Sequence, residues 1–451
     1  MEQQLSNITN ENTVFPEHNE TPKNHKLLLK LILIAVLILG LLIPLLFINN
    51  LIKERATRQE QVIEEVSQKW AGQQTLAGPY LAVPYKVSVQ LEDKTVKTEE
   101  RQVYIMPQEL KINGNLVNEV RKRSLYKVNL YQANCVVEGN FTEIDWKKLN
   151  VNKEQLEWHR ARMVIGLSDV AGLTNEVQVL WGGNKLTMES YVNDQYLTST
   201  GINTLIESGS DYAQSFKFDL QFKGSSTINF LPLGNTTTVQ LQSNFPHPSF
   251  NGKFLPSLPQ AISSKGFEAQ WKTITTQRSF PQAWAGKKVD MHSDEFGVRL
   301  VETANAYVQT ERVVKYAILF IALTFAVFFL IETLQRLQLH PLQYLLVGLA
   351  ILIFYILLLS FSEFIGFKYA YLIASIAIVS MISYYIGAVV QSKKMGLGFF
   401  IGLSALYAYV YFLIQLEDMA LIFGSVAVFF VLGLIMYFTR KVNWYQLQKS
   451  K

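Results

Sequence analysis

The last third of the chain consists of long apolar runs separated by short polar connections. A membrane-spanning helix needs about 20 mostly apolar residues to cross ~30 Å of hydrocarbon at a rise of ~1.5 Å per residue. Runs of this kind follow one another at Tyr316–Ile331, Leu342–Phe361, Tyr369–Val390, Leu397–Leu416 and Met419–Phe438. Because the connections are short, we expect a bundle of five neighbouring transmembrane helices over 316–438.

Another apolar run, Leu31–Ile48, contains no charged residue and follows Lys23, Lys26 and Lys30. It is compatible with a cleaved signal peptide or with an uncleaved anchor. The run is long for a signal peptide, and no small-x-small cleavage site follows it. We therefore interpret 27–48 as a transmembrane anchor helix, which brings the predicted number of spans to six.

Between the anchor and the bundle the pattern changes to short segments in which apolar and polar residues alternate. In 214–223 the apolar residues Phe216, Phe218, Leu220 and Phe222 alternate with the polar residues Lys217, Asp219, Gln221 and Lys223. A period of two is typical of a strand with one buried face. Many such segments at short spacing predict a large β-rich, sandwich-like domain over 72–302.

Turn signals and a change of phase subdivide this domain. Both Gly182-Gly183-Asn184 and Asn113-Gly114-Asn115 are typical of tight turns between strands. The apolar positions have even numbers in Tyr126–Leu130 and odd numbers in Ala133–Phe141. This shift predicts a bulge near Tyr131 or two strands in succession.

The sequence next to the spans predicts two further helices and two polar ends. Apolar residues recur at three- and four-residue steps after the anchor, and 303–315 leads into the second span. The predicted organisation is a disordered cytoplasmic tail (1–26), an anchor (27–48), a membrane-proximal helix (49–71), the β-rich domain (72–302), a second membrane-proximal helix (303–315), the five-helix bundle (316–438) and a cytoplasmic C-terminus (439–451).

The charges between the apolar runs predict the orientation, because basic residues of short loops stay on the cytoplasmic side. The loops and terminus assigned to that side carry Arg336, His340, Lys393, Lys394, Arg440, Lys441, Lys449 and Lys451. The alternate loops carry Glu363, Lys368, Glu417 and Asp418. Both termini are therefore predicted to be cytoplasmic and residues 49–315 to lie outside, in contact with the periplasm.

Composition and motifs narrow the possible chemistry. The net charge of +5 lies largely at predicted cytoplasmic ends, so it favours membrane orientation over nucleic-acid binding. The single cysteine, Cys135, is expected to be a buried hydrophobic residue, and the six histidines show no zinc-binding spacing. Gly398 and Gly402 are interpreted as a small-residue pair for helix packing. We predict no cofactor and no metal.

Motifs in order along most of the chain resemble a known family. They include Trp70-Ala71-Gly72, Gly78-Pro79-Tyr80-Leu81, Val83-Pro84-Tyr85, Phe245-Pro246-His247-Pro248-Ser249-Phe250, Phe328-Phe329-Leu330-Ile331-Glu332, His340-Pro341-Leu342-Gln343-Tyr344, Gln415-Leu416-Glu417-Asp418 and Tyr437-Phe438-Thr439-Arg440. Together they resemble the CreD family of inner-membrane proteins of Gram-negative bacteria. The tail to about Thr21 lies outside this resemblance, and Asn443 stands where the family pattern has Asp.

The resemblance implies a protein of cell envelope integrity and stress response, associated with a two-component regulatory system, colicin tolerance and responses to β-lactams. It implies no enzymatic reaction and hence no catalytic residues. The partners we expect are the lipid bilayer and an envelope protein or lipid bound by the periplasmic domain. The identity of that component and the oligomeric state stay open.

A few polar residues near the spans are candidates for function. Glu332 is either an interfacial partner of Arg336 or a coupling group within the membrane. Tyr407 and Tyr411 belong, with Ser404 and Gln415, to a polar stripe on the fifth span that we expect to face the bundle interior.

Three other candidates lie outside the spans. His247, between two prolines, is either a contact residue or part of a rigid corner that packs Phe245 and Phe250. Glu417 and Asp418 either attract cations at the outer mouth of the bundle or are simply the acids that this topology allows.

The sequence leaves more than one class of function open. We expect a non-enzymatic protein whose periplasmic domain binds an envelope component. A transporter or flippase-like protein that uses the polar face of the fifth span is the alternative. An envelope enzyme is a third possibility, although no cluster of titratable groups stands out to support it.

Overall fold

A computed structural model describes residues 26–90, 96–149, 151–190, 200–206, 211–257, 261–286, 288–300, 305–335, 338–416 and 419–440. The chain divides into two compact units. One contains Met1–Lys53 and Ala306–Lys451 and is called the membrane unit here; the other, Glu54–Asn305, is called the β-domain. The predicted disorder of the N-terminal tail lies outside the described residues.

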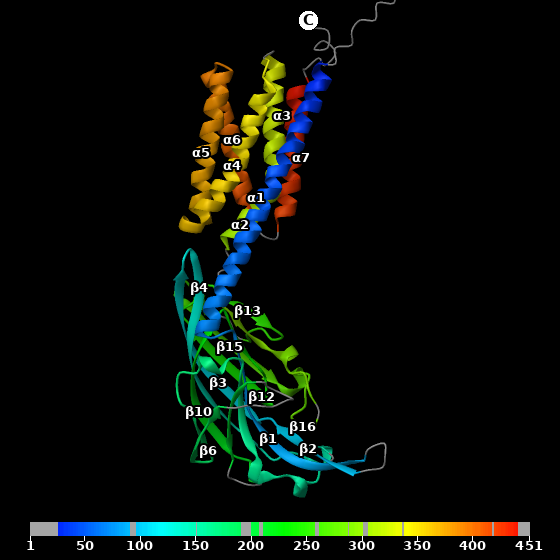
Figure 1. Cartoon of the computed structure of the whole chain (residues 1–451), viewed down its shortest axis with the longest axis vertical. Coiled ribbons are helices and arrows are strands. Elements are labelled where there is room, and N and C mark those ends of the chain that lie inside the picture. Colours follow the sequence, from blue (N-terminus) through cyan, green and yellow to red (C-terminus); the bar gives the residue numbers. More distant parts are fainter. Residues whose placement is uncertain are drawn as a thin grey trace, which may run out of the picture. The chain divides into compact units, whose positions relative to one another are not determined.

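Helices form the described part of the membrane unit (Figure 1). They are α1 (Lys26–Trp70, with its first part in this unit), α2 (Ala306–Lys315), α3 (Ala317–Gln335), α4 (Pro341–Ile365), α5 (Phe367–Val389), α6 (Lys393–Gln415) and α7 (Ala420–Thr439). Each predicted apolar run falls on one of these helices. Within the described residues, four helices are long and apolar enough to cross a membrane, or five if the bent pair α2–α3 is one span.

The ends of the central helices follow from local chemistry. Pro341 occupies the first turn of α4, where its missing N–H has no helical partner to lose, and His340 caps that turn. Gly366, with a φ of +79°, separates α4 from α5. The hydroxyl of Ser392 accepts a hydrogen bond from the backbone N–H of Met395 and caps α6.

The segment before the second span differs from its prediction. We expected 303–315 to lead directly into that span, but α2 and α3 are bent by 42° at a break between them. Within the membrane unit α2 packs against α4, where the Tyr307 hydroxyl donates a hydrogen bond of 2.9 Å to Glu363. Its buried residues, Tyr307, Thr310, Val313 and Val314, lie along one stripe of the helix. This amphipathic pattern explains why α2 packs along α4 and does not continue straight into α3.

Close helix packing occurs at other glycines than the predicted ones. A Cβ atom added at Gly398 or Gly402 would meet nothing within 4 Å, so the prediction for this pair is wrong within the described membrane unit. The close approach lies between α5 and α6, where a Cβ on Gly396 would lie 3.1 Å from the Cα of Gly387. Spacing identifies glycines on one face of a helix, but only the neighbouring helix decides which face is packed.

The described strands of the β-domain form two sheets. In the first sheet, the order β13-β17-β11-β1-β5-β9-β8 is joined by β2, which pairs with β1 and β16. Its strands are β1 (Gln74–Gln90), β2 (Val96–Ile105), β5 (Arg162–Leu167), β8 (Glu189–Ser190), β9 (Gly201–Leu205), β11 (Thr227–Phe230), β13 (Ser249–Gly252), β16 (Ala283–Ala285) and β17 (Phe296–Arg299).

The second sheet has the order β14-β15-β12-β3-β4-β10-β6-β7. Its strands are β3 (Glu109–Arg123), β4 (Tyr126–Asn140), β6 (Gln178–Trp181), β7 (Asn184–Thr187), β10 (Ser215–Ser225), β12 (Thr236–Ser243), β14 (Ala261–Ser263) and β15 (Gly266–Ile274). Short 3-10 helices occur at η1 (Trp146–Leu149), η2 (Lys153–Gln155), η3 (Trp158–Arg160), η4 (Val170–Gly172), η5 (Thr275–Gln277) and η6 (His292–Asp294).

Apolar residues of both sheets belong to one continuous core. Leu81 and Phe230 come from the first sheet, and Ile112 and Trp271 come from the second. A β-rich domain with two sheets around a shared core is therefore confirmed. Cys135 is buried in this core as expected, and burial raises the pKa of its thiol to about 12.

The turn signals had different outcomes. Gly182 and Gly183, with φ of +53° and +95°, connect β6 to β7 in a tight hairpin, as predicted. The turn predicted at Asn113-Gly114-Asn115 is wrong, because these residues lie inside β3. A Cβ atom on Gly114 would lie 2.6 Å from a methyl group of Leu241, so glycine here serves close packing between strands.

The change of phase near Tyr131 is neither a bulge nor a break. Strand β4 pairs continuously with β3 and with β10. The apolar parity changes because different faces of the strand are buried along its length. Near the hairpin end, the Arg121 guanidinium lies 4.0 Å from the centre of the Trp70 ring and Arg123 pairs with Glu65. The second part of α1 therefore covers a face of the hairpin that is exposed further along.

Candidate functional site

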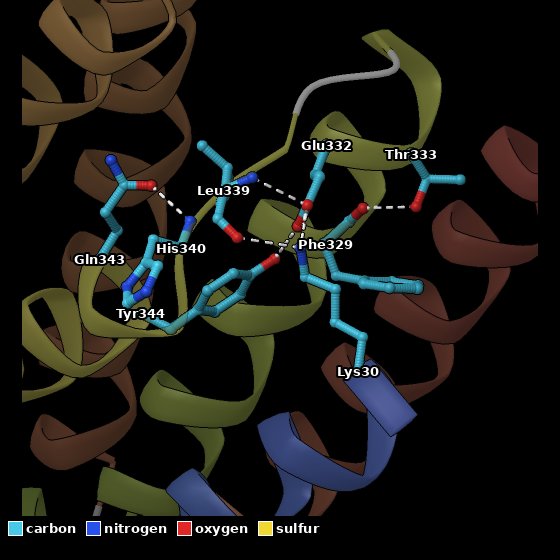
Figure 2. Close-up of polar contacts among 8 residues, drawn as sticks. All are labelled: Lys30, Phe329, Glu332, Thr333, Leu339, His340, Gln343 and Tyr344. Carbon is cyan, nitrogen blue, oxygen red and sulfur yellow. Dashed lines mark hydrogen bonds and ion pairs between the residues drawn. The ribbon is translucent and has the colours of Figure 1, made fainter. Parts of the chain in front are cut away.

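The carboxylate of Glu332 is the centre of a polar cluster within the membrane unit (Figure 2). Its Oε1 atom forms an ion pair with Lys30 and accepts a hydrogen bond of 3.0 Å from the backbone N–H of Leu339. Its Oε2 atom accepts a hydrogen bond of 2.9 Å from the Tyr344 hydroxyl. The Glu332 side chain is only 7% exposed and that of Lys30 is 24% exposed. The buried carboxylate thus has donors on both oxygens.

This cluster joins the consecutive helices α3 and α4 to the start of α1, which lies far from both in the sequence. Lys30 is on α1, Glu332 is on α3 and Tyr344 is on α4. Lys30 also donates a hydrogen bond of 3.0 Å to the carbonyl of Leu339, so the segment between α3 and α4 is held as well. The ring of Tyr344 packs edge-on against Phe328, with ring centres 5.1 Å apart. Polar and aromatic contacts together fix how these helices meet.

The structure gives Glu332 a partner that the sequence did not suggest, namely Lys30, which is 302 residues away. Arg336 lies outside the described residues, so its pairing with Glu332 stays a prediction. Sequence reasoning missed Lys30 because helical spacing finds only neighbours on the same helix. The predicted topology contained a usable signal, since it places the start of the first span and the end of the second on the same side.

The predicted polar stripe of α6 is divided between the bundle interior and a cavity. Tyr407 is 2% exposed and packs against Phe320 and Phe354, with ring centres 4.6 and 4.9 Å apart. Tyr411 and Ser404 are half-buried, and Gln415 is exposed. The expectation that all four face the interior is therefore wrong for Gln415, and Ser404 and Tyr411 line the cavity instead.

The cavity lies between α5 and α6 and has a volume of about 350 Å³. Ser404, Tyr407 and Tyr411 line it from α6, and Tyr371 and Ser375 line it from α5. The Tyr371 hydroxyl donates a hydrogen bond of 2.8 Å to the backbone carbonyl of Tyr407, which ties the two helices together. The structure thus brings together the sequence candidates Tyr407 and Tyr411, but it keeps them in a different cluster from Glu332.

Of the remaining sequence candidates, only His247 is among the described residues, and it is not part of either cluster. His247 lies exposed in the β-domain, between the buried Phe245 and the half-buried Phe250. Phe250 packs edge-on against Trp271, with ring centres 5.6 Å apart, so the two phenylalanines hold the corner while His247 points outward. Glu417 and Asp418 lie outside the described residues, and both of their interpretations stay predictions.

Comparisons with known proteins agree with the arrangement of apolar helices and the β-domain. The model of the family of inner membrane protein CreD matches residues 26–445. The chain belongs to the CreD family. It is 32% identical over 422 residues to inner membrane protein CreD of Escherichia coli, a match that covers 92% of this chain and 93% of that protein. With several candidate spans, this CreD-family chain is a multi-pass protein of the inner membrane.

Solved structures add little to this assignment. A two-domain M1 zinc metallopeptidase bound to L-arginine has a TM-score of 0.20 at 9% identity, with coverage of 43% of this chain and 42% of that one. An M1 zinc metallopeptidase from Deinococcus radiodurans has a TM-score of 0.19 at 10% identity, with the same coverage. Likenesses at these scores carry no argument about the CreD-family fold or chemistry.

The β-domain of the CreD-family chain contains a second buried carboxylate, which sequence reasoning did not identify. Asp294 is fully buried, pairs with Lys253 and accepts hydrogen bonds of 2.5 and 2.9 Å from the backbone N–H and hydroxyl of Ser279. Burial alone would raise the pKa of Asp294, but these donors outweigh it and hold the pKa below its usual value.

No group of three or more His, Cys, Asp or Glu side chains in the described parts of the chain is arranged to hold a metal ion.

Proposed function

We propose that this CreD-family protein spans the inner membrane six times, exposes its β-domain to the periplasm and supports envelope integrity without catalysing a reaction. The alternating charges of the short loops support this topology. The helices that occupy all of the predicted apolar runs support the number of spans. Colicin tolerance and the response to β-lactams are the phenotypes that the family resemblance implies.

A pair of reporter fusions tests the topology. A periplasm-active reporter placed after Asp418 is expected to be active, and the same reporter placed after Lys394 is expected to be silent. The fusion after Lys394 is the matched control, because both reporters follow spans of the same bundle. The opposite pattern would refute the proposed orientation.

We infer that the β-domain binds an anionic envelope component through the end of the β3–β4 hairpin. The side chains exposed at that end support this inference. Lys122 and Lys127 lie directly opposite each other on the two strands. Exposed aliphatic residues lie beside them, with Val120 at 47% and Leu125 at 38% exposure. We call these four residues the hairpin surface.

The charges of the hairpin surface favour a negatively charged partner. Like charges directly opposite each other on paired strands are unfavourable, so an anion between the lysines would relieve a repulsion that the free protein contains. The other face of the hairpin is occupied by the contacts of Arg121 with Trp70 and of Arg123 with Glu65. The lysine face is therefore the one available to a partner.

Site-specific cross-linking of the intact protein in cells tests this surface. A photo-cross-linking residue at Val120 is expected to capture an envelope component, and capture should fall when Lys122 and Lys127 are both replaced by Gln. Val117 is the matched control, because it is 48% exposed on the same strand but on the opposite face. The proposal would be contradicted if Val120 and Val117 captured the component equally, or if capture from Val120 were unchanged when both lysines are replaced.

The alternative, a transporter or flippase-like protein, is favoured by a different observation. The α5–α6 cavity brings Ser404, Tyr407 and Tyr411 together within the membrane unit. If the protein transports a substrate, Tyr407→Phe and Tyr411→Phe should abolish the stress phenotype at normal abundance. If the protein acts through the β-domain, these variants should retain the phenotype, whereas the lysine variants of the hairpin surface should lose it.

A further inference from the structure

The α5–α6 cavity is a groove on the outside of the helices, not an enclosed chamber. Its floor is formed by buried residues, of which Tyr371 is 4% and Val379 is 2% exposed. Its rims carry exposed apolar side chains, with Leu372 at 57%, Ile376 at 55% and Phe400 at 39% exposure. In a membrane-spanning unit such rims face acyl chains, so the groove opens toward lipid.

The groove has a polar end and an apolar length. Lys368 and Tyr369 mark one end at the start of α5, close to Tyr411 near the end of the antiparallel α6. From Lys368 to Val379 the helix rises ~16 Å at ~1.5 Å per residue, which is about half of a ~30 Å hydrocarbon layer. A cation and two tyrosines at the interface, followed by an apolar trough one leaflet deep, match the shape of a lipid.

We propose that this groove binds one glycerophospholipid of the leaflet next to the start of α5, with an acyl chain along the trough and the phosphate at Lys368. The positive charge of Lys368 complements a phosphate, and the first turn of α5 adds backbone N–H groups that favour an anion. This site goes beyond the proposed function, since it depends only on α5 and α6 lying in a membrane.

The charges near the polar end bear on the choice of head group. Glu363, at the end of α4, accepts a hydrogen bond from Tyr307. A phosphate is common to an anionic phosphatidylglycerol and a zwitterionic phosphatidylethanolamine. The carboxylate of Glu363, five residues before Lys368, favours the head group that also carries an amine.

Photolabelling of the full-length protein in nanodiscs tests the site. The probe is a phospholipid with a photoactivatable group in its acyl chain, and labelled peptides are mapped by mass spectrometry. Adducts are expected to concentrate on the parts of α5 and α6 that line the groove. Adducts spread evenly over other exposed apolar helices, such as α7, would refute a specific site.

Matched substitutions test the apolar trough. Ala408→Trp fills the groove and should reduce labelling of α5 several-fold. Ala405→Trp is the control, because Ala405 is also exposed on α6 but does not line the cavity. Equal labelling in both variants would overturn the proposal. If Ala408→Trp lowers the unfolding temperature, the positions of the adducts on the unmodified protein test the site instead.

The head-group contact has its own test. Lys368→Gln should weaken competition by short-chain phospholipids several-fold, whereas Lys393→Gln, a cation at the other end of α6, should not. Competition with phosphatidylglycerol and with phosphatidylethanolamine distinguishes the two sources of phosphate. A diacylglycerol that competes as well as either phospholipid would show that phosphate recognition is absent.

Discussion

The membrane unit and the β-domain each bury a carboxylate, and the two sites use the same kinds of donor for different purposes. Glu332 receives a lysine, a backbone N–H and a tyrosine hydroxyl. Asp294 receives a lysine, a backbone N–H and a serine hydroxyl. Burying a charge is unfavourable unless donors replace the lost water, so both carboxylates are surrounded in this way.

The difference lies in what each carboxylate connects. The partners of Asp294 lie 15 and 41 residues away within a domain that already has a large apolar core. The lysine partner of Glu332 lies 302 residues away and connects the first transmembrane helix to the bundle. Apolar burial drives folding in water but not the association of helices that are already in lipid. We therefore expect the arrangement of the membrane unit to depend more on its buried ion pair.

The largest effect is expected from Glu332→Ala. This change leaves Lys30, the Tyr344 hydroxyl and the Leu339 N–H without their acceptor and should cost about 3–5 kcal/mol in the free energy of unfolding. Denaturant unfolding of the purified full-length protein in detergent measures this cost. Thr333→Ala is the control, because among the described residues that hydroxyl donates to the Phe329 carbonyl of its own helix, and its effect should be small. Equal stability of the two variants would contradict the structural role of Glu332.

A smaller effect is expected from Asp294→Ala in the β-domain. The lost hydrogen bonds should cost about 2–3 kcal/mol, because Lys253 is 39% exposed and can return to water. Thermal unfolding followed by the circular dichroism of the β-strands measures this loss. Asp219→Ala, at an exposed position of β10, should leave the transition unchanged. A greater loss for Asp294 than for Glu332 would reverse the comparison between the two regions.

Glycine substitutions separate helix packing from helix propensity in the membrane unit. Gly396→Leu should cost about 1–3 kcal/mol, because α5 and α6 approach too closely at Gly387 to accept a larger side chain. Gly402→Leu places the same side chain on the same helix in open space and should not destabilise the protein. The midpoints of denaturant unfolding compare the two variants. A larger loss for Gly402→Leu would restore the packing role that the sequence suggested for it.

The smallest effect is expected from pH, and it concerns the β-domain. Because the pKa of folded Asp294 lies below its unfolded value of about 3.9, its contribution to stability is present above pH ~4 and is lost as the pH falls through the folded pKa. The free energy of unfolding should therefore fall between pH 5 and pH 3. Asp294→Asn should lack this part of the pH dependence, and an unchanged pH profile in that variant would contradict the assignment.

Much of the fold could be predicted because apolar patterns act locally. The runs of Leu342–Phe361 and Tyr369–Val390 match α4 and α5 to within a few residues at their ends, and the alternation in 214–223 matches β10 from Ser215 onward. The predictions were wrong where the structural role of a residue depends on a neighbour that is distant in the sequence. Gly114 resembles a turn residue in sequence, but it lies inside β3, where the side chain of Leu241 leaves no room for a Cβ atom. The parity change in β4 resembled a bulge because α1 covers a part of the hairpin.

The candidate site was only partly predictable for the same reason. Glu332 stood out as an ionisable residue at the edge of a span, and Tyr407 and Tyr411 shared a helical face. Neither Lys30 as the partner of Glu332 nor the contribution of α5 to the cavity follows from spacing on a single helix. The hydrogen-bond donors of a buried carboxylate come from segments that meet only in the folded protein. Asp294 could therefore not be identified from the sequence.

By itself the sequence determined the class of the protein: apolar runs long enough for a membrane, an alternating β-rich domain between them, and a family resemblance along most of its length. These properties depend on the length and period of local apolar patterns, which directly determine the type of secondary structure. Only the tertiary structure decided that Lys30 pairs with Glu332, that Gly396 rather than Gly402 packs closely, and that α5 and α6 form a groove. Those outcomes depend on which surfaces meet, and no periodicity along one segment contains that information.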